Sequence, residues 1–269
     1  MSFVVRSADL VPRTVAEGVI GRWVIAPDGL PDGRLSVDLL TLDTSATLDL
    51  AAGPDELLWF QVLAGGLVRD DGTTVGPDHM SMLARGASAT LTAAEPTELF
   101  VARVPPAAAY DPSIPAGAAS FRDWTTEPVM ASEHDARSRI YLASKGLWGT
   151  DAVAGELIVY PPDCAGAAHH HEGAEHFQYV LSGSGTAVLE GEEAPLAAGD
   201  LLYNLENEIH WFRTGDEEMR FVEFFVPGRN RTVWVPGVNA CGWKPTGLDS
   251  RGREPARELA YHLHGQGDV

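Results

Sequence analysis

One segment concentrates histidines within apolar, strand-like sequence: His169-His170-His171-Glu172-Gly173-Ala174-Glu175-His176-Phe177-Gln178-Tyr179-Val180-Leu181-Ser182-Gly183. A further histidine, His210, follows a glycine-marked turn and a second apolar run. Imidazole is the commonest protein metal ligand, and it binds a metal as the neutral base. The pattern therefore predicts a metal site with four candidate ligands, which are His169, His171, His176 and His210.

The spacing of these histidines agrees with strand geometry. Successive side chains of a strand point to opposite faces, so His169 and His171 share a face that excludes His170. A turn over residues 172–175 then leads into a second strand, in which Gln178 shares the face of His176. Residues 199–210 read as strand, tight turn and strand, an arrangement that could return the last histidine to the same cavity.

The histidine spacing resembles the two sequence motifs of the cupin family. The matching residues are His169, His171, His176, Gly183, Gly199 and His210. Leu205 and Asn207 stand where cupins often carry Pro and Gly, and Asn tolerates the positive φ of such a turn. His176 replaces the usual Glu, which resembles the small four-histidine cupins, some of which bind manganese. The resemblance covers about residues 155–227. The alternative is that these are ordinary hydrogen-bonded histidines, which is the usual role of a single histidine in a strand.

Composition limits the classes of partner. The chain has 269 residues, a hydrophobic fraction of 45% and a formal net charge of −19. No basic cluster provides a nucleic-acid footprint, and the acidity disfavours anionic membrane surfaces. There is no long apolar run to span a bilayer and no signal-peptide pattern at the N-terminus. Cys164 and Cys241 make no disulfide framework, so we expect a cytoplasmic protein.

Short apolar runs separated by Gly, Pro and Asp predict an all-β fold. In the first half they cover residues 20–25, 35–41, 57–63, 79–83 and 99–104, and residues 136–227 have the same texture. Together with the resemblance, this pattern predicts two tandem cupin barrels of the double-stranded β-helix, or jelly-roll, type. The expected divisions are a barrel over 1–104, a Pro-rich irregular linker or strap over 105–135, a metal-binding barrel over 136–227 and an irregular extension over 228–269.

The two halves resemble each other, which suggests an internal duplication. When Gly65 is aligned with Gly183 and Gly76 with Gly199, residues that cannot bind metal occupy all four ligand positions: Ala51, Gly53, Leu58 and Ala87. The first barrel is therefore expected to hold no metal, and its His79 is expected to have a structural role. The alternative is that two unrelated β-rich segments share common strand residues.

The C-terminal extension is expected to be mostly irregular. Trp234 and Trp243 lie among glycines and prolines, which is typical of a segment packed over a hydrophobic surface. Residues 254–264 could form a short helix, since Pro255 is tolerated in a first turn. His262 and His264 form a second His-X-His pair, but no third ligand accompanies them, so we assign them no ligand role and expect them in a solvated helix or tail.

Strand parity also selects candidate pocket residues. Gln178 should face the metal cavity, Phe212 shares a face with His210, and Tyr203 is a candidate proton donor. Glu223 is an acidic residue in an apolar strand. If it points inward it could orient a ligand histidine or act as a general base, and if it points outward it is an ordinary solvated charge.

A four-histidine site leaves its ion the full positive charge, which favours Lewis-acid chemistry. Octahedral manganese or iron would keep two open positions, whereas tetrahedral zinc would be closed and structural. We expect one divalent ion per chain, with manganese or iron preferred.

The expected function is an enzyme of dioxygenase type acting on a small oxygen-chelating molecule. The alternatives are a redox-neutral Lewis-acid enzyme (cyclase, isomerase, lyase or aminohydrolase) and a non-enzymatic binding protein. The cupin resemblance also implies a homodimer.

Overall fold

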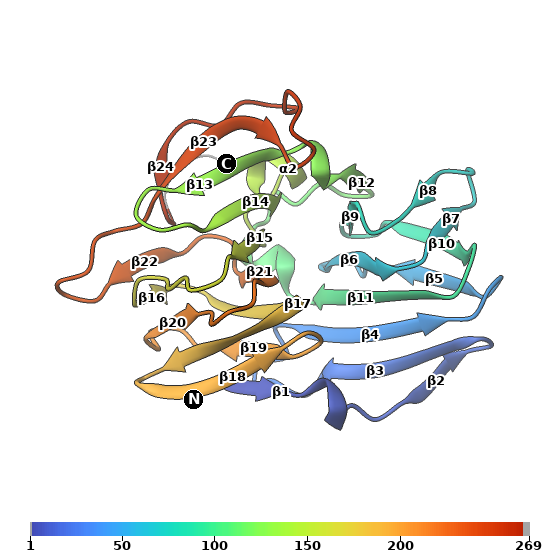
Figure 1. Cartoon of the computed structure of the whole chain (residues 1–269). Coiled ribbons are helices and arrows are strands. Elements are labelled where there is room, and N and C mark those ends of the chain that lie inside the picture. Colours follow the sequence, from blue (N-terminus) through green and yellow to red (C-terminus); the bar gives the residue numbers. More distant parts are fainter. Residues whose placement is uncertain (1, 266–269) are drawn as a thin grey trace. The chain divides into compact units, whose positions relative to one another are not determined.

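The computed structural model describes residues 2–265 and divides them into two compact units. The C-terminal unit contains residues 2–7, 125–147 and 153–265, and the N-terminal unit contains residues 8–124 and 148–152. Both units are built almost entirely from β-strands, which confirms the all-β prediction (Figure 1). Short helical turns lie at or near the divisions: η1 (Ser7–Asp9), η2 (Trp124–Thr126) and α2 (Lys145–Trp148).

The N-terminal unit consists of two sheets. A seven-stranded sheet has the order β12-β9-β6-β11-β4-β3-β2, and a four-stranded sheet has the order β5-β10-β7-β8. The bounds of the elements are β2 Arg13–Ala16, β3 Val19–Ile25, β4 Ser36–Leu42, β5 Thr47–Ala51, β6 Leu57–Ala64, β7 Leu67–Arg69, β8 Thr74–Val75, β9 His79–Leu83, β10 Ser88–Ala93, β11 Thr97–Val104, α1 Ala107–Tyr110 and β12 Ala119–Asp123.

The interior of the N-terminal unit is apolar where the metal site would be. Leu58 and Ala87, which align with ligand positions of the second half, belong to its hydrophobic core. His79 Nδ1 accepts a hydrogen bond from the Gly76 N–H at 3.3 Å, which is the structural role expected for it. Within residues 2–265, both groups of potential metal ligands lie in the C-terminal unit.

The C-terminal unit is one curled sheet of 13 strands. Its main path runs β22-β16-β20-β17-β21-β15-β14-β13-β23-β24, and β1, β18 and β19 join it at the side. The bounds are β1 Phe3–Val5, β13 Pro128–Ser132, β14 Ser138–Ala143, β15 Ala154–Tyr160, β16 His169–Glu172, β17 Glu175–Leu189, β18 Glu192–Ala197, β19 Leu201–Asn204, β20 His210–Arg213, β21 Met219–Val226, β22 Arg231–Trp234, β23 Gly242–Asp249 and β24 His262–Leu263.

The long strand β17 closes this sheet on itself. Its first half pairs with β19 and β21, and its second half pairs with β18 and β20 (Figure 1). The change of partners falls at Gly183, whose φ of +73° is unusual for any other residue. A buried cluster that includes Val180, Phe212 and Phe221 fills the space that the curled strand encloses.

Replacing Gly183 with alanine should destabilise the C-terminal unit. A Cβ atom at this position would lie 1.7 Å from the backbone oxygen of Glu218, and backbone cannot move aside as a flexible side chain can. Gly191 is the matched control, because its φ is +91° and a Cβ there would meet nothing within 4 Å. We expect Gly183→Ala to lower the free energy of unfolding by at least about 2 kcal/mol more than Gly191→Ala does. Equal losses in urea titrations would contradict this reading.

Three expectations about secondary structure are wrong. The segment 105–135 is not irregular throughout, because it contains α1, β12 and β13, and β12 extends a sheet by pairing with β9. Residues 254–264 form no helix; they run as bends into β24, which pairs with β23. Residues 3–5 belong to the C-terminal unit, because β1 pairs with the edge of β19. Each difference arises from pairing between strands far apart in sequence, which local composition does not encode.

Among residues 2–265, no helix has both the length and the apolar character that crossing a bilayer requires.

Candidate metal centre

Three neighbouring strands carry the four candidate ligands. His169 and His171 lie on β16, His176 begins the inward face of β17, and His210 starts β20 directly opposite His169. One ring nitrogen each from His171, His176 and His210 lies within 4.8 Å of the others. The ring of His169 lies 4.6 Å from that of His210 and 4.9 Å from that of His171. The structure therefore brings the four histidines together, as the spacing predicts.

Hydrogen bonds on the far side of the rings determine which nitrogen faces the centre. His169 Nδ1 lies 2.8 Å from the Ala167 carbonyl, and His210 Nδ1 lies 2.9 Å from the Glu208 carbonyl. A carbonyl only accepts, so both Nδ1 atoms carry the proton and both Nε2 atoms keep a lone pair. His171 Nδ1 contacts Thr232 Oγ1 at 3.3 Å. These contacts correspond to the outer hydrogen bonds that usually orient metal-binding imidazoles.

The inward nitrogens fit a bound cation. His171 Nε2 is buried and has no hydrogen-bond partner among residues 2–265. His176 Nε2 and His210 Nε2 lie 3.1 Å apart, so a proton or a cation must lie between two atoms that would otherwise repel. Two nitrogens on bonds of about 2.1 Å lie about 3.0 Å apart at a right angle and about 3.4 Å apart at the tetrahedral angle. The observed separation is closer to the right angle.

The environment keeps these imidazoles in the neutral form that binds metals. Burial lowers the pKa of His169, His171 and His176 well below the ordinary value, and neighbouring histidines lower it further. Burial likewise lowers the pKa of His210 to about 4. The four rings are therefore neutral at neutral pH, and no positive charge has to be lost from them before an ion can bind.

A buried carboxyl pair lies beside His176. Glu223 Oε1 is 3.5 Å from His176 Nε2, so Glu223 points inward. Glu156 is its direct cross-strand neighbour on β15, and the two carboxyl groups are hydrogen-bonded. Burial, and then the charge of Glu156, raise the pKa of Glu223 to about 8. The pair therefore holds one proton at neutral pH, since two buried carboxylates in contact resist ionising together.

Amide side chains fix the orientation of this pair. Gln178 donates from Nε2 to Glu223, and Asn204 Nδ2 donates to Gln178 Oε1 at 2.8 Å. Gln178 and Asn204 are both completely buried. This chain of hydrogen bonds holds Glu223 against His176 without any help from solvent.

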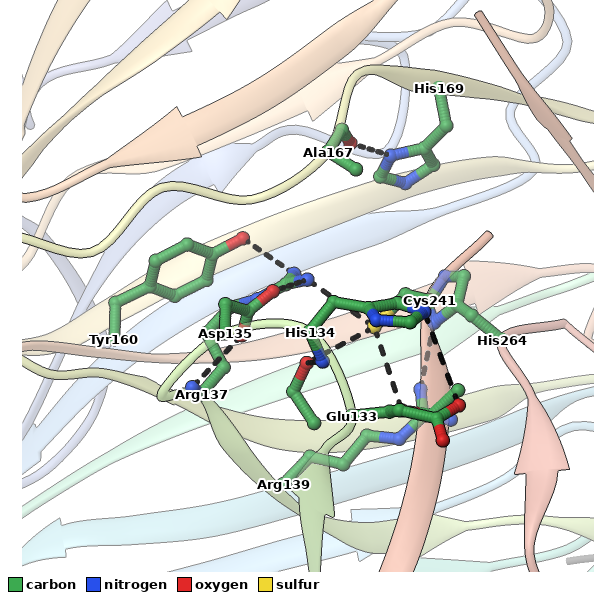
Figure 2. Close-up of polar contacts among 12 residues, drawn as sticks. Glu133, His134, Asp135, Arg137, Arg139, Tyr160, Ala167, His169, Cys241 and His264 are labelled. Atoms are coloured by element: carbon green, nitrogen blue, oxygen red, sulfur yellow. Dashed lines mark hydrogen bonds and ion pairs between the residues drawn. The ribbon is translucent and has the colours of Figure 1, made fainter. Parts of the chain in front are cut away.

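Two arginines and one unexpected histidine complete the surroundings. Arg137 and Arg139 are buried, and Figure 2 shows their contacts with Asp135, Tyr160 and His264. Arg139 Nη1 lies 2.7 Å from Glu156 and 2.8 Å from His264 Nδ1. His264 forms a second group of potential ligands with His169 and His171. The prediction that the His262–His264 pair belongs to a solvated tail is therefore wrong for His264, which is only 9% exposed.

Comparison with known proteins identifies the fold family. The family model described as a cupin domain matches residues 156–225. The oxalate-binding protein of Thermotoga maritima is 30% identical over 87 residues, which are 32% of this chain and 72% of that protein. The chain belongs to the cupin family. The pectin degradation protein KdgF of Dickeya dadantii is 28% identical over 82 residues, which are 30% of this chain and 74% of that protein.

Solved structures extend the likeness from one cupin barrel to both units. A mutant of Bacillus subtilis oxalate decarboxylase superposes with a TM-score of 0.65, covering 87% of this chain and 79% of the other, at 17% identity. A second structure of that enzyme, described by the assignment of its Mn(II) centres, gives the same values. At this identity the match establishes the fold, which is the two-barrel cupin arrangement expected from the sequence.

The remaining predicted pocket residues lie in different parts of the cupin barrel, and not all of them face the histidines. Gln178 lies beside Glu223, as expected from its strand parity. Phe212 packs in the barrel core against Tyr160 and Phe221, with its ring 6.4 Å from that of His210. Tyr203 is on the opposite face of β19 from Asn204, where it stacks on Phe3 and donates a hydrogen bond to Glu175. The expectation that Tyr203 lines the pocket is therefore wrong, because alternation on β19 turns Asn204 inward instead.

Two aromatic rings that were not predicted at the site border the candidate metal centre. Phe225 lies 4.8 Å from the ring of His171 and 4.9 Å from that of His176. Trp234 on β22 lies 5.0 Å from the ring of His169. These rings limit the water that can reach the histidines. Cys164 is buried, and burial raises the pKa of its thiol, which keeps the thiol protonated and unreactive.

Proposed function

We propose that this cupin is a metal-dependent enzyme that acts on a small, oxygen-chelating organic anion at the four-histidine centre. The observation that carries the proposal is the convergence of neutral imidazole nitrogens, with lone pairs directed inward and no carboxylate among them. His169, His171, His176 and His210 would hold one divalent ion. When bound, the ion supplies a Lewis acid that polarises a substrate oxygen.

We propose manganese or iron as the ion, ahead of zinc. The 3.1 Å separation of His176 Nε2 and His210 Nε2 suits ligands at right angles, as in octahedral coordination. Four imidazoles on such an ion leave two positions for a bidentate ligand or for two separate ligands. The printed description of Mn(II) centres in a structural neighbour is in line with this preference.

The charges around the centre favour an anionic substrate. Arg137 and Arg139 bring two buried guanidinium groups to this end of the barrel. Asp135 pairs with Arg137, and the Glu156–Glu223 pair carries about one negative charge because it retains a proton. With the ion added, the balance is positive. A dicarboxylate that chelates the ion would restore neutrality in a region of low polarity, and a monocarboxylate would reduce the excess positive charge.

Glu223 is proposed as the acid–base group of the reaction. Its pKa of about 8 lets it carry a proton at neutral pH and exchange that proton with a bound molecule. We expect Glu223→Gln to keep the metal content of the wild type and to lower turnover by about 10²–10⁴-fold. Glu218→Gln is the matched control just before the same strand, because the Glu218 side chain is 41% exposed, and it should leave turnover unchanged. Full activity in Glu223→Gln would remove Glu223 from the mechanism.

Oxygen uptake separates the candidate reaction classes. We propose dioxygenase chemistry first, because two open positions could accept a substrate and oxygen together. A redox-neutral reaction is the second candidate, favoured by the protonated carboxyl pair beside the centre. A binding role without turnover is the third, in keeping with the printed name of the Thermotoga maritima relative.

The test uses manganese- and iron-loaded protein with oxalate as the first probe, and follows probe loss and dissolved oxygen together. Coupled loss of oxalate and oxygen would support an oxygen-dependent oxidoreductase, in which incorporation of ¹⁸O₂ into the product marks a dioxygenase and release of hydrogen peroxide marks an oxidase. Loss of oxalate alone would support the redox-neutral class. Binding without any loss would support a binding protein. Absence of both binding and turnover would contradict an oxalate-like substrate.

A further inference from the structure

His264 approaches the metal centre from the C-terminal segment. It follows β24, which pairs with β23 through Trp243 and His262. One ring nitrogen of His264 lies within 4.8 Å of ring nitrogens of both His169 and His171. Its ring is 5.5 Å from that of His169 and 5.6 Å from that of His171. By distance alone, His264 could be a fifth ligand.

The contact with Arg139 decides against that role. Arg139 Nη1 lies 2.8 Å from His264 Nδ1 (Figure 2). A guanidinium group has only donors, so Nδ1 must accept, and it must hold the ring's lone pair. The ring is therefore neutral, because an imidazolium would carry a proton on Nδ1 and could not accept there. A neutral imidazole with its lone pair on Nδ1 carries its proton on Nε2.

The tautomer of His264 is therefore opposite to that of the proposed ligands. His169 and His210 have their protons on Nδ1 because carbonyl groups accept from that atom. A metal ligand needs a lone pair directed at the ion, and His264 instead presents an N–H group on the side away from Arg139.

Contacts on every side fix His264 in this orientation. Arg139 is itself held by Glu156 at 2.7 Å and by the face of Trp243, 4.1 Å from its ring centroid. The backbone N–H of His264 donates to the Cys241 carbonyl at 2.9 Å. Gly265 packs so closely on Thr232 that a Cβ atom would meet Thr232 Oγ1 at 2.4 Å.

We propose that His264 donates a hydrogen bond from Nε2 to an anionic oxygen of the molecule bound at the metal centre, so that the C-terminal segment helps to select anionic ligands. This inference rests on the proposed function, since it requires an ion at the centre. A molecule held at the centre beside His169 and His171 would lie close to His264, because one ring nitrogen of His264 is within 4.8 Å of ring nitrogens of both residues. Arg139 is then a positioning residue, because it fixes the tautomer of His264.

The first test reads the tautomer directly. The protein is labelled with ¹⁵N-histidine, and long-range ¹H–¹⁵N spectra are recorded for the metal-free and the diamagnetic zinc-loaded forms. We expect the signal set that disappears in His264→Gln to have a proton on Nε2 and none on Nδ1. His79, whose Nδ1 also accepts a hydrogen bond, should give a similar set that remains in this variant. Zinc should move the Nε2 resonances of the four proposed ligands and leave His264 Nε2 protonated. A proton on Nδ1 of His264, or loss of its Nε2 proton with zinc, would overturn the proposal.

The second test measures anion binding by manganese-loaded protein, with oxalate, formate and azide as probes. Water-proton relaxation reports displacement of water from the ion. His264→Phe keeps a ring but loses the donor, and we expect it to weaken anion binding about tenfold or more while the metal content is unchanged. His264→Gln keeps a donor and should stay within about threefold of the wild type. His134→Phe, at an exposed site, is the control.

The outcomes distinguish this inference from the proposed function. Equal anion affinity in wild type and His264→Phe would overturn the donor role, and so would metal loss in His264→Phe, because that would make His264 a ligand. A metal-loaded wild type that binds none of the three anions would also overturn it. A wild type that takes up no metal would instead overturn the proposed function, while the metal-free spectra would still report the tautomer of His264.

Discussion

We expect His169→Ala/His171→Ala to abolish stoichiometric metal binding. Wild-type protein, untagged and purified without chelators, should carry about one manganese or iron ion per chain, and the double variant should carry less than about a tenth of that. The substitution removes two of the four neutral nitrogen ligands. Two imidazoles bind a divalent ion too weakly to retain it during dialysis at micromolar metal. Elemental analysis of both proteins provides the measurement.

His170→Ala is the control for this experiment, because His170 lies between the two ligands but on the opposite face of β16, with its Nε2 3.8 Å from Glu172. Its metal content should equal that of the wild type. A double variant that still held one ion per chain would refute the four-histidine centre. Zinc in the wild type, lost in the variant, would keep the site but favour the redox-neutral class over the dioxygenase.

The sequence predicted the clustering of the four histidines because strand geometry is local. Alternation on β16 requires that His169 and His171 share a face, whatever the rest of the fold does. The turn before His210 could also be predicted, because Asn207 stands where cupins often carry glycine. Its φ of +67° agrees with that prediction. These features depend on neighbours within a few residues along the chain.

The role of His264 could not be predicted in the same way. It depends on the pairing of β24 with β23 and on a contact with Arg139, which is 125 residues away in sequence. No periodicity connects such segments. A strand of two residues at the end of an irregular segment is also too short to show an alternating pattern. The sequence therefore allowed a helix there as readily as a strand.

The carboxyl pair is an intermediate case. Glu156 lies in an apolar strand just as Glu223 does, and the same signal, an acid among buried residues, was present in both. What the sequence lacks is the register that places the two side chains opposite each other on β15 and β21. That register, and the presence of Arg139, decide between an inward carboxyl and an outward solvated one.

Removing Arg139 should have the second large effect, on stability. Arg139 is 2% exposed and is the cation that faces the Glu156 carboxylate in the barrel interior. Arg139→Met would leave that carboxylate buried without a partner charge, and loss of one member of a buried ion pair typically costs about 3–5 kcal/mol. Urea unfolding of metal-free protein, followed by circular dichroism and by tryptophan fluorescence, should show a loss of this size. Arg220→Met breaks an exposed pair with Glu218 and should cost less than about 1 kcal/mol.

The double variant Arg139→Met/Glu156→Gln determines whether the cost arises from the uncompensated charge. Glutamine has nearly the shape of glutamate and can still hydrogen-bond to Glu223, so it removes the charge without leaving a cavity. If the loss in Arg139→Met comes from the isolated carboxylate, the double variant should regain at least about 1–2 kcal/mol of it. If the losses simply add, the guanidinium stabilises the barrel through its packing on Trp243 and its contact with His264 rather than through Glu156. The carboxyl pair would then have to be balanced by another cation, and Arg137 is the buried candidate on the same segment of chain.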